Sequence, residues 1–473
     1  MHESGVSSPM NTQRTVIALL MQLRAAAAIA CITAIVGCTQ HAATPAAPSD
    51  VGTMNAQSMV AEQPQTDPAV VTAPTPQQAT TATPPALRPV PDPQRSLTRT
   101  HAAQARGLAW TLANQRPDGS FGTFESPRAR EIYLDTQASH RAFHTATTAL
   151  VCWSLVVPAR TDPACSAALL RGLTWLEAQG EVGRASGNTF YSIWAHTYLL
   201  ELASAILADP ARAADHQAWR AILEREVQVA RREQSAEGGW AYYDFNHVGQ
   251  NPSGHESTSF NTGAMIEALL NARTQGADIP AGTIADALTC MERMRIPSGS
   301  FAYGTYAELN VAGDYNKVSG ASGRLQVCNL ALFRSDSKGT DGEMLLRGVE
   351  LLRERHFYIE IARGRVMPHE AFYRNSGYYY FFGHYYCARV LQVAPAGPRR
   401  DLLVRWLAEQ MAIDQNRDGS WFDYPLYGYG FAYATGFAMR TLEILEPMIA
   451  EQVRATGGTG AVPMPPASST VNP

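Results

Sequence analysis

Gln115-Arg-Pro-Asp-Gly119-Ser-Phe121 is the stretch that decides the fold, because it recurs along the chain. It returns as Gln234-Ser-Ala-Glu-Gly238-Gly-Trp240 and as Gln415-Asn-Arg-Asp-Gly419-Ser-Trp421, and a degenerate copy, Arg295-Ile-Pro-Ser-Gly299-Ser-Phe301, has Arg in place of Gln. The copies start at 115, 234, 295 and 415, so the intervals are 119, 61 and 120 residues. A common period of about 60 residues predicts six repeats between residues 96 and 454.

A helical segment precedes each copy, and a second, more apolar helix follows it after a loop. The first helices contain Arg106-Gly-Leu-Ala-Trp110, Arg171-Gly-Leu-Thr-Trp175 and Arg347-Gly-Val-Glu-Leu351, or run from Val404 to Gln410. The second helices open on an aromatic-x-Thr signature: Phe143-His-Thr145, Phe260-Asn-Thr262 and Tyr433-Ala-Thr435. Alternating β-branched segments are scarce. Each repeat is therefore predicted to be two antiparallel helices, the amphipathic one in an outer ring and the apolar one in an inner ring.

The Arg-Gly-x-x-aromatic segment followed by Gln-x3-Gly-x-Trp resembles the QW repeat of the terpenoid cyclase and protein prenyltransferase superfamily. The resemblance covers residues 96–454 and implies an all-α fold, an α6/α6 toroid of six helix pairs. We interpret the motif itself as structural, since the Gln amide can cap a helix end while the aromatic ring packs against the next repeat. Gln115, Trp240 and Trp421 are accordingly not candidates for catalysis.

The catalytic residues of this superfamily have no clear counterpart in the chain. Squalene–hopene cyclases protonate an alkene with an Asp-x-Asp-Asp motif, which occurs nowhere in this sequence. Protein prenyltransferases hold zinc with Asp, Cys and His, and the nearest match is His384-Tyr-Tyr-Cys387, which has no acidic residue on the same element. We expect neither a metal nor a cofactor.

The N-terminal region has the composition of an export signal followed by a tether. Residues 25–36 form an apolar run, too short to cross a bilayer, that follows Arg24 and leads to Gly37-Cys38. This resembles the lipobox of bacterial lipoproteins and predicts a signal peptide over 1–37 and lipidation of Cys38. Residues 38–95 are rich in Pro, Ala and Thr and contain no aromatic residue, so a disordered linker is expected there and a disordered tail over 455–473. The predicted location is the cell envelope, in the outer membrane facing the periplasm, with a membrane anchor through the lipid.

The amino-acid composition excludes some classes of protein and of binding partner. The chain has 473 residues, a net charge of −4, and is 17% charged, and its mean hydropathy of −0.18 excludes a polytopic membrane protein. Clustered Lys and Arg are absent, which argues against binding of nucleic acid. Five cysteines lie in the repeat region, and whether Cys152 and Cys165 form a disulfide is left open.

The loops between each motif and its inner helix should gather at one end of the barrel. The side chains predicted to share this rim and the cavity below it are His140, His144, Asp244, His255, Glu256, Arg374, Tyr379, His384 and Asp423. Aromatic residues are dense between Phe372 and Tyr386 and again after Trp421, so an aromatic-walled cavity is expected there. One hypothesis is a toroid that binds a small, apolar, isoprenoid-like or polymeric ligand without cyclase chemistry. The other is an envelope enzyme, a polysaccharide lyase or hydrolase, whose acid–base groups come from the same loops.

Overall fold

The structure of the protein is a computed structural model that describes residues 87–125, 137–187, 189–244, 256–307 and 310–457. The predicted signal peptide, Cys38, nearly all of the linker and most of the tail lie outside these residues. Within the described part, α-helices dominate, and strand is confined to a hairpin of β1 (Arg295–Ile296) and β2 (Ser300–Phe301), in which Arg295 pairs with Phe301.

Twelve long helices alternate between an outer and an inner ring. The outer helices are α2 (Pro93–Ala113), α4 (Pro163–Gln179), α6 (His216–Arg232), α8 (Thr283–Arg293), α11 (Gly342–Glu360) and α13 (Pro398–Asp414). The inner helices are α3 (Gln137–Leu155), α5 (Ser192–Ala208), α7 (Ser259–Thr274), α10 (Leu325–Arg334), α12 (Tyr380–Val393) and α14 (Tyr429–Ala455), with the short α9 (Val318–Ala321) before α10.

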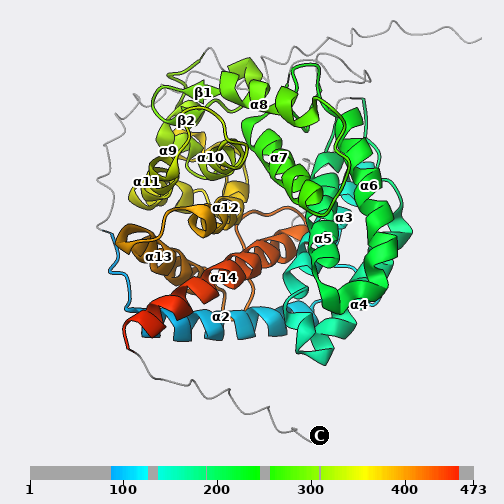
Figure 1. Cartoon of the computed structure of the whole chain (residues 1–473), viewed down its shortest axis with the longest axis horizontal. Helices are drawn as coiled ribbons and strands as arrows, with labels where there is room; N and C mark the ends of the chain where they lie inside the picture. Colours follow the sequence, from blue (N-terminus) through cyan, green and yellow to red (C-terminus); the bar gives the residue numbers. More distant parts are fainter. Residues whose placement is uncertain (1–86, 126–136, 188, 245–255, 308–309, 458–473) are drawn as a thin grey trace, which may run out of the picture. The chain divides into compact units, whose positions relative to one another are not determined.

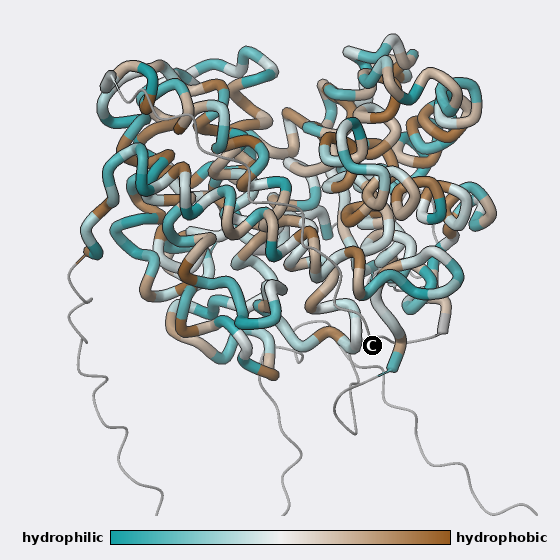
Figure 2. Tube along the Cα trace, turned by 90° about the horizontal axis from the view of Figure 1, so that it is seen from below, coloured by the Kyte–Doolittle hydropathy of each residue, from teal (hydrophilic) through white to brown (hydrophobic). Residues whose placement is uncertain are grey.

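The inner helices form a closed circle. Each packs against the next, from α3 through α5, α7, α10 and α12 to α14, which returns to α3 (Figure 1). Each inner helix also packs on the outer helix that follows it in the chain, with α14 packing on α2, and α13 on α2 closes the outer ring. Apolar and polar stretches alternate along the tube in Figure 2, because most helices bury one face. The fold is an α/α toroid of six helix pairs, as the repeat period predicts.

The Gln-x3-Gly-x-aromatic motifs join consecutive outer helices. The Gln115 side-chain amide donates to the carbonyl of Gly119, 2.9 Å away within the motif, and to that of Ala168 in α4, at 2.7 Å. Gln415 forms the same pair of bonds to Gly419 and to Ala103 in α2. The predicted role is therefore confirmed, with the difference that the amide binds a carbonyl within the next outer helix instead of capping its end.

The arginine of the Arg-Gly pair completes this junction from the other side. Arg171 donates to the side-chain oxygen of Gln115, and Arg106 donates to that of Gln415. Gly419 has a φ of +96°, and a Cβ there would collide with the carbonyl oxygen of Arg106. Only glycine combines this left-handed backbone with so close an approach.

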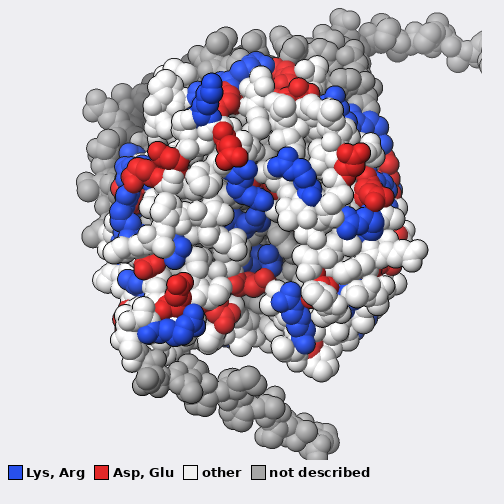
Figure 3. Space-filling model, in the orientation of Figure 1, with Lys and Arg blue, Asp and Glu red and all other residues white. Residues whose placement is uncertain are grey.

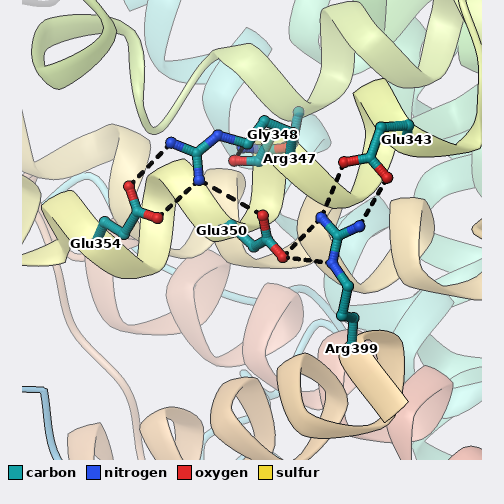
Figure 4. Close-up of polar contacts among 7 residues, drawn as sticks. Glu343, Arg347, Gly348, Glu350, Glu354 and Arg399 are labelled. Carbon is teal, nitrogen blue, oxygen red and sulfur yellow. Dashed lines mark hydrogen bonds and ion pairs between the residues drawn. The ribbon is translucent and has the colours of Figure 1, made fainter. Parts of the chain in front are cut away.

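The degenerate fourth motif shows what happens without the glutamine. Arg295 binds the carbonyls of Lys338 and Gly339, each at 3.2 Å. Arg347, the arginine that would bind the missing glutamine, instead pairs with Glu350 and Glu354 on its own helix (Figure 4). Arg399 of α13 extends this group of ion pairs to Glu350 and Glu343. Two cationic side chains cannot bind each other as Arg171 and Gln115 do, so Arg295 reaches the carbonyls just before α11 instead, and ion pairs join α11 to α13 at the next junction.

Threonines of the inner helices hold the motif aromatic residues in place. The Thr262 hydroxyl accepts from the backbone N–H of Trp240, and Thr435 accepts from Trp421, both at 3.1 Å. In the first repeat the hydroxyl that accepts from Phe121 belongs to Thr148 rather than to Thr145. Thr148 is therefore the equivalent of Thr262 and Thr435, and the predicted match at Thr145 lies one helical turn too early.

The predicted boundaries and cysteine pairing can also be compared with the structure. Helix α2 begins at Pro93, three residues before Ser96, because the Asp92 carboxylate accepts from the backbone N–H of Arg95 at 2.9 Å and Pro93 suits the first helical position. Cys152 and Cys165 are buried and unbridged, and burial raises the pKa of both thiols.

Aromatic rings meet in the middle of the inner circle. Trp194 of α5 and Phe382 of α12, which stand on opposite sides of the circle, have ring centroids 6.1 Å apart. Phe260 contacts both rings, and Tyr198 reaches Phe437 of α14 at 5.7 Å. These five side chains, which we call the aromatic layer, fill the middle of the barrel, where the sequence predicted an aromatic-walled cavity.

Candidate functional site

Tyrosine hydroxyls converge where the inner helices begin. Tyr191 and Tyr379 directly precede α5 and α12, and Tyr433 lies in the first turns of α14. The loops after two of the motif aromatic residues supply further members. We call this group the tyrosine rim: Tyr191, Tyr242, Tyr243, Tyr303, Tyr378, Tyr379 and Tyr433. Four of them, Tyr242, Tyr243, Tyr378 and Tyr433, are only half-buried, so the rim presents aromatic surface to solvent.

The hydroxyls of the rim are linked to one another. Tyr379 donates to the hydroxyl of Tyr303 at 2.9 Å, and that hydroxyl lies 2.6 Å from the hydroxyl of Tyr242. Tyr191 and Tyr243 form a further hydroxyl pair. Burial raises the pKa of Tyr303 and Tyr379 well above the ordinary value of 10, so both stay neutral and each can donate a hydrogen bond as well as accept one.

Two cationic or basic groups support this end of the rim. The Arg324 guanidinium lies 4.8 Å from the ring centre of Tyr303 and 5.8 Å from that of Tyr379, which orients both rings by cation–π attraction. The pKa of His369 is lowered by burial, so the imidazole is neutral at pH 7. Its Nδ1 lies 2.8 Å from the carbonyl oxygen of Arg374 and must carry the proton, which leaves Nε2 to accept from the Tyr378 hydroxyl at 3.0 Å.

Asp423 is the carboxyl group of the rim. It is fully buried, its Oδ2 accepts from the backbone N–H of Phe381 at 3.1 Å, and its Oδ1 accepts from the Tyr433 hydroxyl. Burial raises the pKa of Asp423 to about 7, an effect that the two hydrogen bonds and the charge of Arg363 only partly offset. The carboxyl group is thus poised to gain or lose a proton near neutral pH.

Two of the predicted histidines form a second group around Tyr429. The ring centres of His140 and His144 lie 6.1 and 5.8 Å from that of Tyr429. The Nε2 of His144 lies 2.9 Å from the hydroxyl oxygen of Ser120, and burial lowers the pKa of His144 to about 4. Burial also lowers the pKa of His140. Both rings are therefore neutral at pH 7.

Other predicted residues lie near the rim, but their side chains are buried or paired within the loops, or are exposed to solvent. Asp244 is fully buried and pairs with Arg184 at 3.2 Å, while Glu256 is buried just before α7. The Arg374 side chain is exposed, and only its backbone carbonyl takes part in the site, through His369. His255 lies outside the described residues.

His384 lies apart from the others. Its ring is fully buried between inner helix α12 and the outer layer, where its Nε2 is 2.9 Å from the Nε2 of His356 in α11 and its Nδ1 is 2.6 Å from the carbonyl oxygen of Tyr380. The ring centre of Trp406 in α13 is 6.4 Å away. A residue in the middle of an inner helix can face outward, and sequence position alone placed His384 at the rim.

Tyr242 and Tyr303 lie at the rim but were not predicted from the sequence. Each stands two residues after a motif aromatic residue, Trp240 or Phe301, as the predicted Asp423 does after Trp421. This spacing was an available signal, although Asp423 was predicted as a loop residue and not from the spacing. Among the described residues, no group of three or more His, Cys, Asp or Glu side chains has the arrangement of a metal site.

No family model and no curated protein matches the sequence. Similar solved structures include a type II terpene cyclase from Scytonema with its product merosterolic acid A, which is 13% identical with a TM-score of 0.45. They also include an α-1,6-mannanase of Salegentibacter, 11% identical with a TM-score of 0.46; each alignment covers 75% of this chain and 99% of the other. At these values, neither similarity bears on activity. In the part of the chain that the structure describes, no helix has both the length and the apolarity needed to cross a bilayer.

Proposed function

We propose that the toroid binds a carbohydrate chain at the tyrosine rim and that the protein is a lipoprotein of the cell envelope. The observation that carries the binding proposal is the linked set of tyrosine hydroxyls beside half-buried aromatic faces. A sugar ring has an apolar face that packs on aromatic rings and hydroxyl groups that exchange hydrogen bonds with neutral tyrosines. An isoprenoid chain would pack on the aromatic rings but could form no hydrogen bond with these hydroxyls, which are bonded to one another and to neighbouring side chains.

The aromatic layer gives this proposal its geometry. Because the rings of Trp194 and Phe382 meet across the barrel, we expect a ligand to lie over the rim and not to pass between these two helices. A polymer that rests across the mouth satisfies this constraint, whereas a long apolar chain would need a deep cavity to bury its surface.

Removing single rim hydroxyls tests the proposal. Tyr243→Phe and Tyr378→Phe keep the half-buried rings and delete one hydrogen-bonding group each, so each variant should bind a carbohydrate about 3- to 10-fold more weakly. The measurement is calorimetric titration of the full-length chain with a panel of soluble mannan, β-glucan and peptidoglycan fragments, with geranylgeraniol as the apolar comparison.

Tyr358→Phe is the matched control, because Tyr358 is a half-buried tyrosine of the outer helix α11. It should bind as the wild type does. Geranylgeraniol binding that both rim variants retain, with no binding of any glycan, would contradict the proposal and favour the apolar ligand.

An enzyme acting on a polysaccharide is the second candidate, and two observations favour it. The neutral His369 accepts a hydrogen bond from the Tyr378 hydroxyl, which orients that hydroxyl for proton transfer with a bound substrate. Tyr378 in turn packs on Tyr424, the neighbour of Asp423, with ring centres 5.2 Å apart, which brings a carboxyl group of raised pKa to the same region. Mass spectrometry of each glycan after incubation distinguishes cleavage from binding alone.

The envelope anchor is tested separately through Cys38. In bacterial lipoproteins the cysteine after the signal peptide carries the lipid, so Cys38→Ser should move the protein from the membrane fraction to the soluble fraction in its own host. Cys31→Ser, which changes a cysteine within the predicted signal peptide, is the control and should stay with the membrane. If Cys38→Ser and wild type both remain membrane-bound, the anchor lies elsewhere.

A further inference from the structure

The inner helices contribute a second, charged cluster on the other side of the aromatic layer from the tyrosine rim, toward their C-terminal ends. One residue comes from each inner helix, and together we call them the C-terminal cluster: Trp153, Glu201, Glu267, Arg334, Arg389 and Arg440. In the view of Figure 3, acidic and basic side chains gather around a hollow in the middle of the face.

The contacts show that the cluster is one connected network. Arg334 donates through Nη1 to Glu267 Oε2 at 2.7 Å, and Arg389 donates through Nη2 to the same oxygen at 3.4 Å. Asn271 accepts from Arg334 at 3.0 Å and donates to Glu201 Oε2 at 2.7 Å, so it connects the two carboxylates. Arg389 also donates to the Tyr385 hydroxyl at 3.0 Å, and the Tyr385 ring contacts Trp153, with ring centres 5.5 Å apart. Arg440 lies over the ring of Trp153, 4.4 Å from its centre, and pairs with Glu443.

The network leaves hydrogen-bonding capacity unused on both the acidic and the basic groups. The second oxygens of Glu201 and Glu267 are buried and have no hydrogen-bond partner among the described residues, although their carboxyl groups are 2% and 0% exposed. The three guanidinium side chains keep 22%, 13% and 13% exposure, in the order Arg334, Arg389 and Arg440. A buried carboxylate oxygen without a donor costs free energy, so a purely structural network would be expected to use both oxygens.

We propose that the C-terminal cluster is a second binding site, for a small hydroxylated carboxylate of the uronate type. A carboxylate suits the partly exposed guanidinium groups, which bind such groups in paired, charge-assisted hydrogen bonds. Hydroxyl groups on the same molecule donate to the unpaired oxygens of Glu201 and Glu267. A simple anion would satisfy only the arginines, and a neutral sugar would satisfy only the glutamates.

The site does not depend on the proposed function of the tyrosine rim. The aromatic layer separates the two, since Trp194, Phe260 and Phe382 contact one another across the middle of the barrel. A ligand at one mouth therefore cannot reach the other through the barrel.

Calorimetric titration of the full-length protein with D-glucuronate, and with D-glucose as the neutral match, tests the site. We expect saturable glucuronate binding that weakens as the salt concentration rises, and no binding of glucose. Arg389→Gln and Arg440→Gln should each weaken glucuronate binding about 10-fold or more, because each removes a guanidinium from the C-terminal cluster. Arg389→Gln could fail to fold, because Arg389 pairs with the buried Glu267. Arg440→Gln is the second variant, and it keeps the test valid in that case.

Two controls define the outcome. Arg399→Gln removes an arginine from the outer surface, where it pairs with Glu343 and Glu350, and should bind glucuronate as the wild type does. Tyr378→Phe should also leave this binding unchanged, which separates the result from the test of the tyrosine rim. Absence of glucuronate binding, equal binding of glucose, or wild-type affinity in folded Arg440→Gln would each overturn the proposal.

Discussion

Replacement of Trp421 by alanine is expected to lower the free energy of unfolding by about 3 to 5 kcal/mol, the cost typical of removing a fully buried large aromatic side chain. Trp421 is 0% exposed, and its indole N–H donates to the carbonyl of Met411 at 2.8 Å. Its ring packs against Gly107 of α2, beside which the sulfur of Met439 in α14 also lies. The substitution therefore opens a cavity at the seam where the last repeat meets the first.

Urea unfolding followed by far-ultraviolet circular dichroism measures this loss without depending on tryptophan fluorescence. Phe431→Ala is the matched control, because Phe431 is an aromatic residue of the same repeat with 39% exposure, and it should cost about 1 kcal/mol or less. If the two variants lose similar amounts of stability, Trp421 is not a principal contact of the closed ring.

The repeat architecture could be predicted because the junctions between helices are local in sequence. Gln115, Gly119 and Phe121 lie within seven residues, and copies of this motif return at intervals of 119, 61 and 120 residues. The partners of that motif were less predictable. The hydroxyl that binds the Phe121 backbone belongs to Thr148, 27 residues away, whereas Thr435 is only 14 residues from Trp421. The length of the loop between the motif and the inner helix varies from repeat to repeat. For this reason the sequence pattern selected Thr145 in the first repeat, one helical turn before Thr148.

The candidate site was harder to predict for a different reason. Which face of an inner helix a side chain occupies depends on the rotation of that helix, and His384, in an inner helix, turned toward Trp406 and His356 instead of the barrel mouth. The C-terminal cluster was even harder to predict from the sequence than the tyrosine rim. Glu201, Glu267 and Arg389 come from three repeats without a shared motif, and only closure of the ring brings them together.

The pH dependence of stability should reveal the raised pKa of Asp423. In the unfolded chain this carboxyl group titrates near the ordinary value of 3.8, whereas burial raises the pKa to about 7 in the folded protein. Between these values the folded state binds the proton more tightly, so the contribution of Asp423 to stability is fully present below pH 4 and is lost as the pH rises toward 7. The largest loss is about 4 kcal/mol, from roughly three pKa units at 1.36 kcal/mol each.

The comparison of wild type with Asp423→Asn isolates this contribution. His144 acts in the opposite direction over much of the same range, because its pKa is lowered by burial to about 4 and its contribution is lost as the pH falls below 6.5. The absolute profile therefore mixes the two groups, whereas the difference between the two proteins contains only Asp423. Because Asn cannot ionise yet can still accept from the Phe381 N–H, its stability relative to the wild type should rise steadily from pH 4 to pH 7 in urea unfolding at fixed ionic strength. A difference that stays constant over this range would mean that Asp423 is already ionised at low pH and that the Tyr433 hydroxyl and the Phe381 N–H stabilise the charge more than burial penalises it.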